Sequence, residues 1–156
     1  MTYQELITGA GEALGIPGMI PDDAGDVTIA DESFTIVIGH DAAQNRVVVH
    51  GLVCPVPEND GAGLYRMLLA ANFAVEEMKG AALAVDEGSV YLCRSDRVEG
   101  LSVETFTGLL QDLADALAKF RAAVEAFVRL GDEVEDRKAE LPAAEPEDES
   151  EMIIRG

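Results

Sequence analysis

Few side chains in this sequence have the types and spacing that catalysis or metal binding would need. His40 is expected at the end of a strand and His50 within one, where histidines are more often turn and sheet residues than catalysts. The acidic pairs Asp22–Asp23 and Glu76–Glu77 could act as general acid and base. Neither pair lies in a recognisable site, and solvated charge explains both. We therefore expect no catalytic residue and no enzymatic activity.

Glycines and cysteines add no cofactor or metal site to this interpretation. The stretch "GAGLYR" (61–66) lacks the GK[ST] ending of a phosphate-binding loop, and neither GxSxG nor HExxH occurs. Cys54 and Cys93 lack CxxC spacing and have apolar neighbours, which favours buried free thiols over a disulfide. We expect no cofactor and no metal.

Composition limits the class of partner. The chain has 156 residues, 48% of them hydrophobic, so one domain with a packed core is expected. A formal net charge of -19 repels phosphate backbones and anionic lipids, which argues against nucleic-acid and membrane-surface roles. The first residues lack a secretory signal and no apolar run is long enough to span a bilayer, so we expect a cytoplasmic protein.

Hydrophobic periodicity predicts an α+β fold. Thr2 and Glu5 form a capping-box pattern at the start of a helix, and Ser102 is a suitable cap for the last one. The predicted order is α-β-β-β-α-β-β-α, with three helices packed on a mostly antiparallel, twisted sheet. The expected elements are a helix over 2–14, strands within 26–30, 33–39 and 45–54, a helix over 62–79, a hairpin over 81–94 and a helix from 102.

The last helix has one continuous apolar seam, and the chain changes character after it. Residues 131–156 contain ten acids and three bases, which predicts a disordered acidic tail after a domain of residues 1–130. Its default role is to keep the protein soluble. The seam residues are spaced alternately by four and three: Phe106, Leu110, Leu113, Leu117, Phe120, Val124 and Phe127.

The helix over 62–79 has more apolar surface than one core requires. Tyr65, Leu69 and Phe73 project opposite the face that carries Leu64 and Leu68. Loops or the "PVPEND" segment could cover these three residues. Alternatively, the helix meets its copy across a two-fold axis, which is the commonest arrangement of homodimers.

The stretch "LYRMLLAANFAVEEMKGAALAVDEGSVYLCRSDRVEGLSVETFTGLLQDLADALAKF" (64–120) resembles class I type III secretion chaperones, the Tir-chaperone or CesT-like family. The Leu-Leu-x-x-Asn-like motif of that family is matched by Leu68, Leu69 and Asn72. A step of small residues into a strand, an acidic-glycine turn and a long final helix follow in the same order. The resemblance extends from Thr2 to about Val128.

This resemblance implies a small acidic homodimer that binds the N-terminal segment of a secreted effector in extended form. Strand addition at a sheet edge would supply affinity, and apolar grooves would select side chains. The acidic tail could then also occupy the groove or contact the secretion apparatus. The expected effector-binding residues, some of them core, are Leu6, Ile7, Leu14, Ile29, Phe34, Ile36 and Ile38; those of the dimer interface are Tyr65, Leu69, Phe73, Leu83 and Val85.

Two other interpretations of the sequence stay open. YbjN-like cytoplasmic proteins have a similar topology, which would make this chain a protein-binding module of another kind. The third is a small-ligand-binding or enzymatic domain with its site in the cleft between helix and sheet. That alternative requires a concave polar pocket that binds a metabolite.

Overall fold

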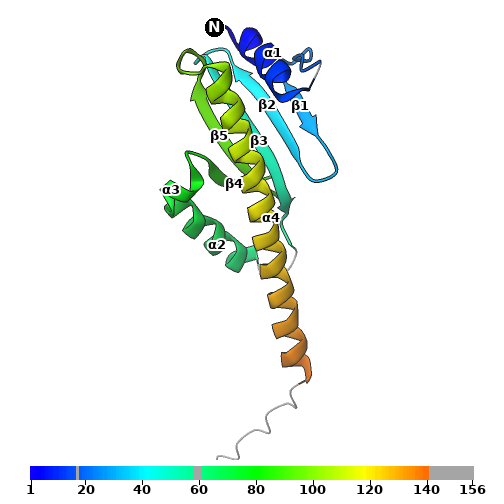
Figure 1. Ribbon diagram of the computed structural model, residues 1–156. Helices are drawn as coiled ribbons and strands as arrows, with labels where there is room; N and C mark the ends of the chain where they lie inside the picture. Colours follow the sequence, from blue (N-terminus) through cyan, green and yellow to red (C-terminus); the bar gives the residue numbers. More distant parts are fainter. Residues whose placement is uncertain (17, 58–60, 141–156) are drawn as a thin grey trace, which may run out of the picture.

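The computed structural model describes residues 1–16, 18–57 and 61–140 of the chain (Figure 1). The architecture is α+β, as the sequence predicts, and the strands begin and end within three residues of their expected positions. The elements are α1 (Tyr3–Leu14), β1 (Val27–Ala30), β2 (Thr35–Asp41), β3 (Arg46–Pro55), α2 (Gly61–Phe73), α3 (Val75–Met78), β4 (Ala82–Asp86), β5 (Ser89–Arg97), the 3-10 turn η1 (Val98–Gly100) and α4 (Val103–Glu140).

The five strands form one antiparallel sheet in the order β1-β2-β3-β5-β4. Alternate residues of β3 are buried, and α1 and α4 form a layer on one face of the sheet (Figure 1). The period of two follows from the pleat, which directs successive side chains to opposite faces. Because the buried residues alternate, the core lies on one side of the sheet. The strand order makes β1 and β4 the two edge strands.

Helix α1 begins and ends where the sequence predicts. The Thr2 hydroxyl accepts a hydrogen bond from Glu5 N, and Thr2 N donates to the Glu5 carboxylate at 2.8 Å, which completes the capping box. Gly15 ends the helix with φ of 69°, a left-handed conformation that glycine adopts without steric cost. The buried side of α1 faces the sheet through Leu6, Ile7 and Ala10.

Helix α4 packs across the centre of the sheet through its predicted seam. Phe106 and Leu117 are fully buried, and the seam residues between them are nearly so. Gly51 on β3 permits this close approach, because a Cβ atom at that position would lie 2.3 Å from Leu117 Cδ1. At the other end of the layer, a Cβ at Gly9 would lie 2.6 Å from Val103 Cγ2, so glycine also brings α1 against α4.

Arg121 fixes the middle of α4 to the backbone of two hairpins. Its Nε donates to Val53 O at 3.0 Å and its Nη2 to Leu52 O at 2.9 Å, where the β3–β5 register shifts at a bulge. Its Nη1 donates to Ser33 O in the turn between β1 and β2. One planar guanidinium thus joins three carbonyls from segments distant in sequence, which suits its fixed fork of donors.

Two helices differ from the expectation. The helix predicted over 62–79 is divided at Ala74, where ψ of 67° leaves the helical region, and the short α3 follows. This change of direction lets Met78 enter the core while α2 remains at the β4 edge.

The last helix continues to Glu140, so the expected domain boundary at residue 130 falls within it. Glutamate, lysine, arginine and alanine are strong helix formers, which accounts for helix in a segment too polar for a core. Residues 141–156 of the predicted tail lie outside the described residues. Among the helices described, none combines the length and apolar character needed to cross a membrane.

We predict that Gly51→Ala destabilises the domain by about 1–3 kcal/mol, because the added methyl group forces the buried Leu117 to move in a packed core. Gly108→Ala is the control: it lies in α4 with open space around it, and alanine there is expected to stabilise the helix by about 0.5–1 kcal/mol. Urea unfolding followed by circular dichroism measures both. Equal stability of the Gly51 variant and the parent chain would refute the close contact.

Candidate partner-binding surfaces

The β1 edge of the sheet is open to an added strand. The turn between β1 and β2 is closed by a hydrogen bond from Asp31 N to Phe34 O, at 3.0 Å. Bonded pairs alternate along an antiparallel ladder, so Val27 and Ile29 direct their backbone groups to β2. Thr28 and Ala30 direct theirs outward. An extended chain can therefore pair with β1 through these two residues.

The structure divides the residues expected in the effector-binding groove into two groups. Leu6, Ile7, Ile36 and Ile38 are at most 2% exposed, so they are the members of this set that belong to the core. Leu6 and Ile7 lie on the buried side of α1, and Ile36 and Ile38 occupy the buried positions of β2. The remaining three, Leu14, Ile29 and Phe34, are partly exposed against the core and remain candidates for contact with a partner.

A hollow beside the start of β1 was not predicted from the sequence. It has a volume of about 400 Å³ and lies between the first turn of α1, the loop before β1 and the end of β2. Tyr3 and His40 stack within its wall, with ring centroids 4.5 Å apart, and His40 Nε2 lies 3.2 Å from Asn45 Oδ1. The Tyr3 hydroxyl lies 3.0 Å from Gly25 O and 3.2 Å from Ile38 O, and it donates to these carbonyls.

The environment of Tyr3 changes its acidity. Burial, together with the carboxylates of Asp26 and Asp22, raises the pKa of Tyr3 from 10.0 to about 12. The folded chain therefore holds this proton to a higher pH than the unfolded chain does. His40, considered above as a possible catalyst, is used in the same wall as a stacking and hydrogen-bonding residue.

The surplus apolar face of α2 is exposed in the single chain. The exposed fractions are 43% for Tyr65, 69% for Leu69 and 89% for Phe73, and Val85 on the neighbouring strand β4 is 43% exposed. We call these four residues the α2 stripe. Leu83, expected in the same interface, is only 6% exposed because its side chain points to the core, so its inclusion was wrong.

Asn72 attaches α2 to β4. Its Oδ1 accepts a hydrogen bond from Leu83 N at 2.7 Å, and its Nδ2 donates to Leu83 O at 3.0 Å. The side-chain amide thus makes both contacts that a neighbouring strand would make. Within about one turn of α2, Leu68 is therefore buried, Leu69 is exposed and Asn72 pairs with the edge strand β4.

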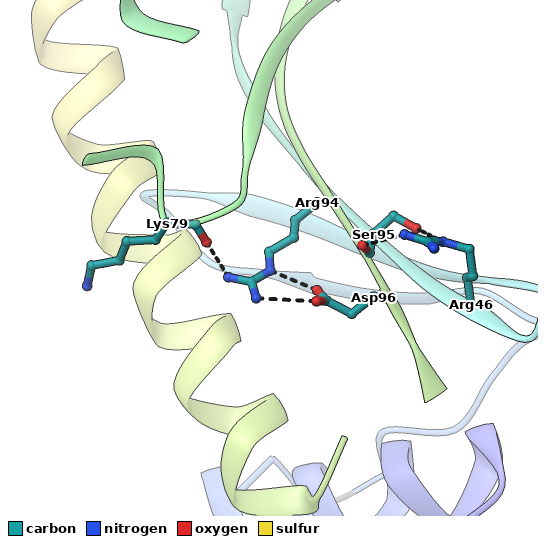
Figure 2. A network of polar contacts seen from close by, with 5 residues as sticks. All are labelled: Arg46, Lys79, Arg94, Ser95 and Asp96. Atoms are coloured by element: carbon teal, nitrogen blue, oxygen red, sulfur yellow. Dashed lines mark hydrogen bonds and ion pairs between the residues drawn. The ribbon is translucent and has the colours of Figure 1, made fainter. Parts of the chain in front are cut away.

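Charged side chains anchor the end of α3 (Figure 2). Arg94 Nη1 donates to Lys79 O at 2.5 Å, and Arg94 Nε lies 2.7 Å from Asp96 Oδ2. Lys79 Nζ in turn lies 2.6 Å from Asp112 on α4. A separate pair joins neighbouring strands, with Arg46 Nε donating to the Ser95 hydroxyl at 2.8 Å (Figure 2).

A cavity of about 190 Å³ lies between this network and the apolar side of α4, where Leu113 and Phe120 contribute to its lining. The charged groups of Arg94, Asp96, Lys79 and Asp112 each have a partner across the cavity wall or beside it. The charged network beside this cavity is therefore explained by the attachment of α3 to β5 and α4.

The other residues considered for chemistry are dispersed. Asp22 Oδ1 accepts hydrogen bonds from Ala24 N and Asp26 N, each at 2.9 Å, so it stabilises a turn. His50 meets Tyr91 edge to face, with centroids 6.0 Å apart. In the part of the chain that the structure describes, no three His, Cys, Asp or Glu residues are grouped so that they could hold a metal ion.

The two cysteines are free and half-buried in the structure. Burial raises the pKa of the Cys93 thiol. At Cys54 burial also dominates and raises the pKa, against a lowering effect of Arg121. A raised pKa reduces the thiolate fraction at neutral pH, which makes both thiols poor nucleophiles.

Known proteins share both the sequence pattern and the fold. Residues 5–129 match the family model described as the Tir chaperone protein (CesT) family. A chain of the HopA1–SchA chaperone–effector complex is 25% identical with a TM-score of 0.66, over 77% of this chain and 93% of that chain. No curated protein matches.

Two further solved structures share the fold at lower identity. A chain of the ExsC–ExsE complex is 21% identical with a TM-score of 0.66, over 78% of this chain and 96% of that chain. The structure of the Yersinia pestis type III secretion chaperone SycH with a stable fragment of YscM2 matches at 15% identity and a TM-score of 0.60, over 76% of this chain and 99% of that chain.

We predict that the Tyr3 hydroxyl makes stability fall as the pH rises from about 10 to about 12. The unfolded chain loses this proton near pH 10 and the folded chain near pH 12, so ionisation favours unfolding in that window and has no effect below it. Urea unfolding at several pH values should show the stability difference between the parent chain and Tyr3→Phe constant below pH 10 and shrinking above it. A constant difference up to pH 12 would contradict this, and Tyr65→Phe, at an exposed tyrosine, is the control.

Proposed function

This chain belongs to the Tir chaperone protein (CesT) family, and from that premise we propose that it is a type III secretion chaperone for a secreted effector. It binds the N-terminal segment of the effector in extended form and keeps the effector soluble and competent for secretion. The fold is shared with proteins solved in the HopA1–SchA chaperone–effector complex and the heterodimeric ExoU–SpcU complex from the type III secretion system of Pseudomonas aeruginosa, which supports this proposal.

The open β1 edge is the structural observation that carries the binding mode. Main-chain hydrogen bonds from Thr28 and Ala30 place few demands on the partner's sequence, so the edge supplies affinity. Ile29 and Phe34 are partly exposed on the helix-facing side of the same hairpin, where they can contact apolar side chains of the added segment. The β1 edge and these two side chains together favour an extended, partly apolar partner over a compact one.

The remaining features fit a binding protein. We propose that the chaperone acts in the cytoplasm without catalysis or cofactor, since its histidines and Asp22 are used in stacking and turn contacts. We also propose that the acidic segment after residue 130 is dispensable for folding and keeps the complex soluble. Contact with the secretion apparatus is a further role open to that segment.

We predict that Thr28→Pro weakens effector binding at least about tenfold, because proline removes an outward N–H and obstructs an added strand. Fold stability should change little, since that N–H does not face β2. Binding is measured by calorimetry with the N-terminal segment of a secreted protein that is recovered with this chain from its native cells, after co-expression establishes the pair.

Two controls separate edge pairing from general damage. Thr28→Ala keeps the backbone donor and should bind normally. Ile29→Pro removes a donor that faces β2, so it should lower the unfolding midpoint. Undiminished binding by a folded Thr28→Pro variant would exclude strand addition at β1.

The same family membership supports a homodimer, which we propose forms through the α2 stripe. Tyr65, Leu69 and Phe73 are spaced by four residues on one side of α2, and Val85 lies on the adjoining strand. None of these side chains is charged, so a second copy can cover them without burying unpaired charge. An isologous contact between two such stripes is self-complementary by symmetry.

We predict that Leu69→Asp with Phe73→Asp converts the dimer to a monomer, because four like charges would meet at the two-fold interface. Light scattering coupled to size exclusion gives the mass. Leu130→Asp introduces the same charge at an exposed leucine on α4 and should leave the dimer intact. A dimer that survives both stripe substitutions would place the interface elsewhere.

A further inference from the structure

The two edges of the sheet are unequal. β4 pairs with β5 around the tight turn at Glu87 and Gly88, both with positive φ. Counting bonded pairs from Asp86 and Ser89 at that turn, Leu83 and Val85 direct their backbone groups outward. Asn72 satisfies both outward groups of Leu83, whereas β1 has an open edge. One edge is thus closed by a side chain and the other is left for an added strand.

β4 lacks the usual protection of an edge strand. Such strands are commonly shielded by a central charge, a proline or a bulge, because their unpaired groups otherwise recruit strands from other chains. The first four residues of β4 are Ala-Leu-Ala-Val, and its pairing with β5 is regular. Because these four residues include no charge, proline or bulge, the side-chain amide of Asn72 protects this edge instead.

The position of Asn72 also sets the orientation of α2. On the helix it lies between Leu68, which is buried, and Phe73, which is almost fully exposed. Two hydrogen bonds to one residue of a fixed strand restrain rotation of the helix about its own axis. The α2 stripe is thereby turned away from the core.

We propose that Asn72 is a specificity-determining positioning residue for association, which closes β4 to strand addition and reserves the α2 stripe for the second copy. The closure of β4 stands on hydrogen bonds within one chain, while the assignment of the stripe rests on the homodimer proposed above. Without Asn72, β4 strands of two copies can pair antiparallel through Leu83 and Val85 and join two sheets edge to edge. Asn72 excludes that arrangement.

The test uses Asn72→Leu, which keeps the approximate size and does not lower the helix propensity, but forms no hydrogen bond. It is made in the full chain and in the background of Leu69→Asp with Phe73→Asp, in which the stripe cannot associate. Amide hydrogen exchange at Leu83 and light scattering over a range of concentrations are the readouts. At low concentration, we expect exchange at Leu83 to be about tenfold faster or more.

At high concentration, the combined variant should associate again, with protection returning at Leu83 and Val85. A folded combined variant that stays monomeric at all concentrations would overturn the closing role of Asn72, whatever its exchange rate. Gln44→Leu, at an exposed amide in the turn between β2 and β3, is the matched control and should change neither readout. If Asn72→Leu does not fold, Asn72→Ala replaces it with the same expected outcomes.

The outcomes also separate this inference from the proposed dimer. If the stripe substitutions alone leave a dimer, the stripe proposal fails, and Asn72 is then judged in the full chain. There, Asn72→Leu must speed exchange at Leu83 and produce species larger than the dimer for the inference to stand. Unchanged exchange with an unchanged mass would overturn it.

Discussion

The packing of α4 across β3 is the contact on which the rest of the structure depends. Leu117 lies over Gly51, where any other residue would force the helix or the side chain away, and Arg121 joins the same helix to three backbone carbonyls. Because this contact fixes the centre of the sheet, the edge strands need not stabilise the fold alone. The β1 edge is thereby available for contact with another chain, and the helix α2 beside β4 is likewise free of a role in this central contact.

The two edges of the sheet, with the helices beside them, differ in the groups that they expose to other chains. At β1 the chain presents backbone groups of Thr28 and Ala30 next to half-buried apolar side chains, which suits an extended peptide. At β4 the backbone of Leu83 is occupied by Asn72, and the apolar surface lies on the adjacent helix instead. In the binding modes proposed above, strand pairing and helix packing use opposite edges, so an effector and a second copy would not compete for one surface.

The sequence predicts the order and type of the elements well, because each has a strong local signal. The capping box at Thr2, the seam from Phe106 to Phe127 and the acidic-glycine turn at residues 86–88 depend only on neighbours in the chain. The apolar residues Tyr65, Leu69 and Phe73 were also identified from the sequence as surplus to one core, and of the two alternatives left open, coverage by loops or exposure, the single chain shows exposure. Each of these signals lies in the order of neighbouring residues, so it can be recognised without knowledge of the tertiary contacts.

What the sequence could not predict depends on contacts between distant segments. Ile36 and Ile29 have the same residue type in neighbouring strands, yet one is core and the other partly exposed, because burial depends on where the helices lie over the sheet. The break at Ala74 and the hydrogen bonds of Arg121 likewise arise from tertiary geometry. The pairing between the Asn72 amide on α2 and the backbone N–H and C=O of Leu83 on β4 has no sequence period that could reveal it.

The net charge of -19 opposes non-specific association of a chain that exposes apolar surface. Copies that approach through their acidic surfaces repel each other, so random apolar contacts are suppressed. At physiological ionic strength the repulsion is screened beyond about 8 Å, so it does not prevent a contact that buries uncharged residues in register. The α2 stripe has no charged member, and four of the five β4 residues are also uncharged. Charge therefore opposes encounters in general, while the hydrogen bonds of Asn72 decide which of the two uncharged surfaces at this edge remains open to another chain.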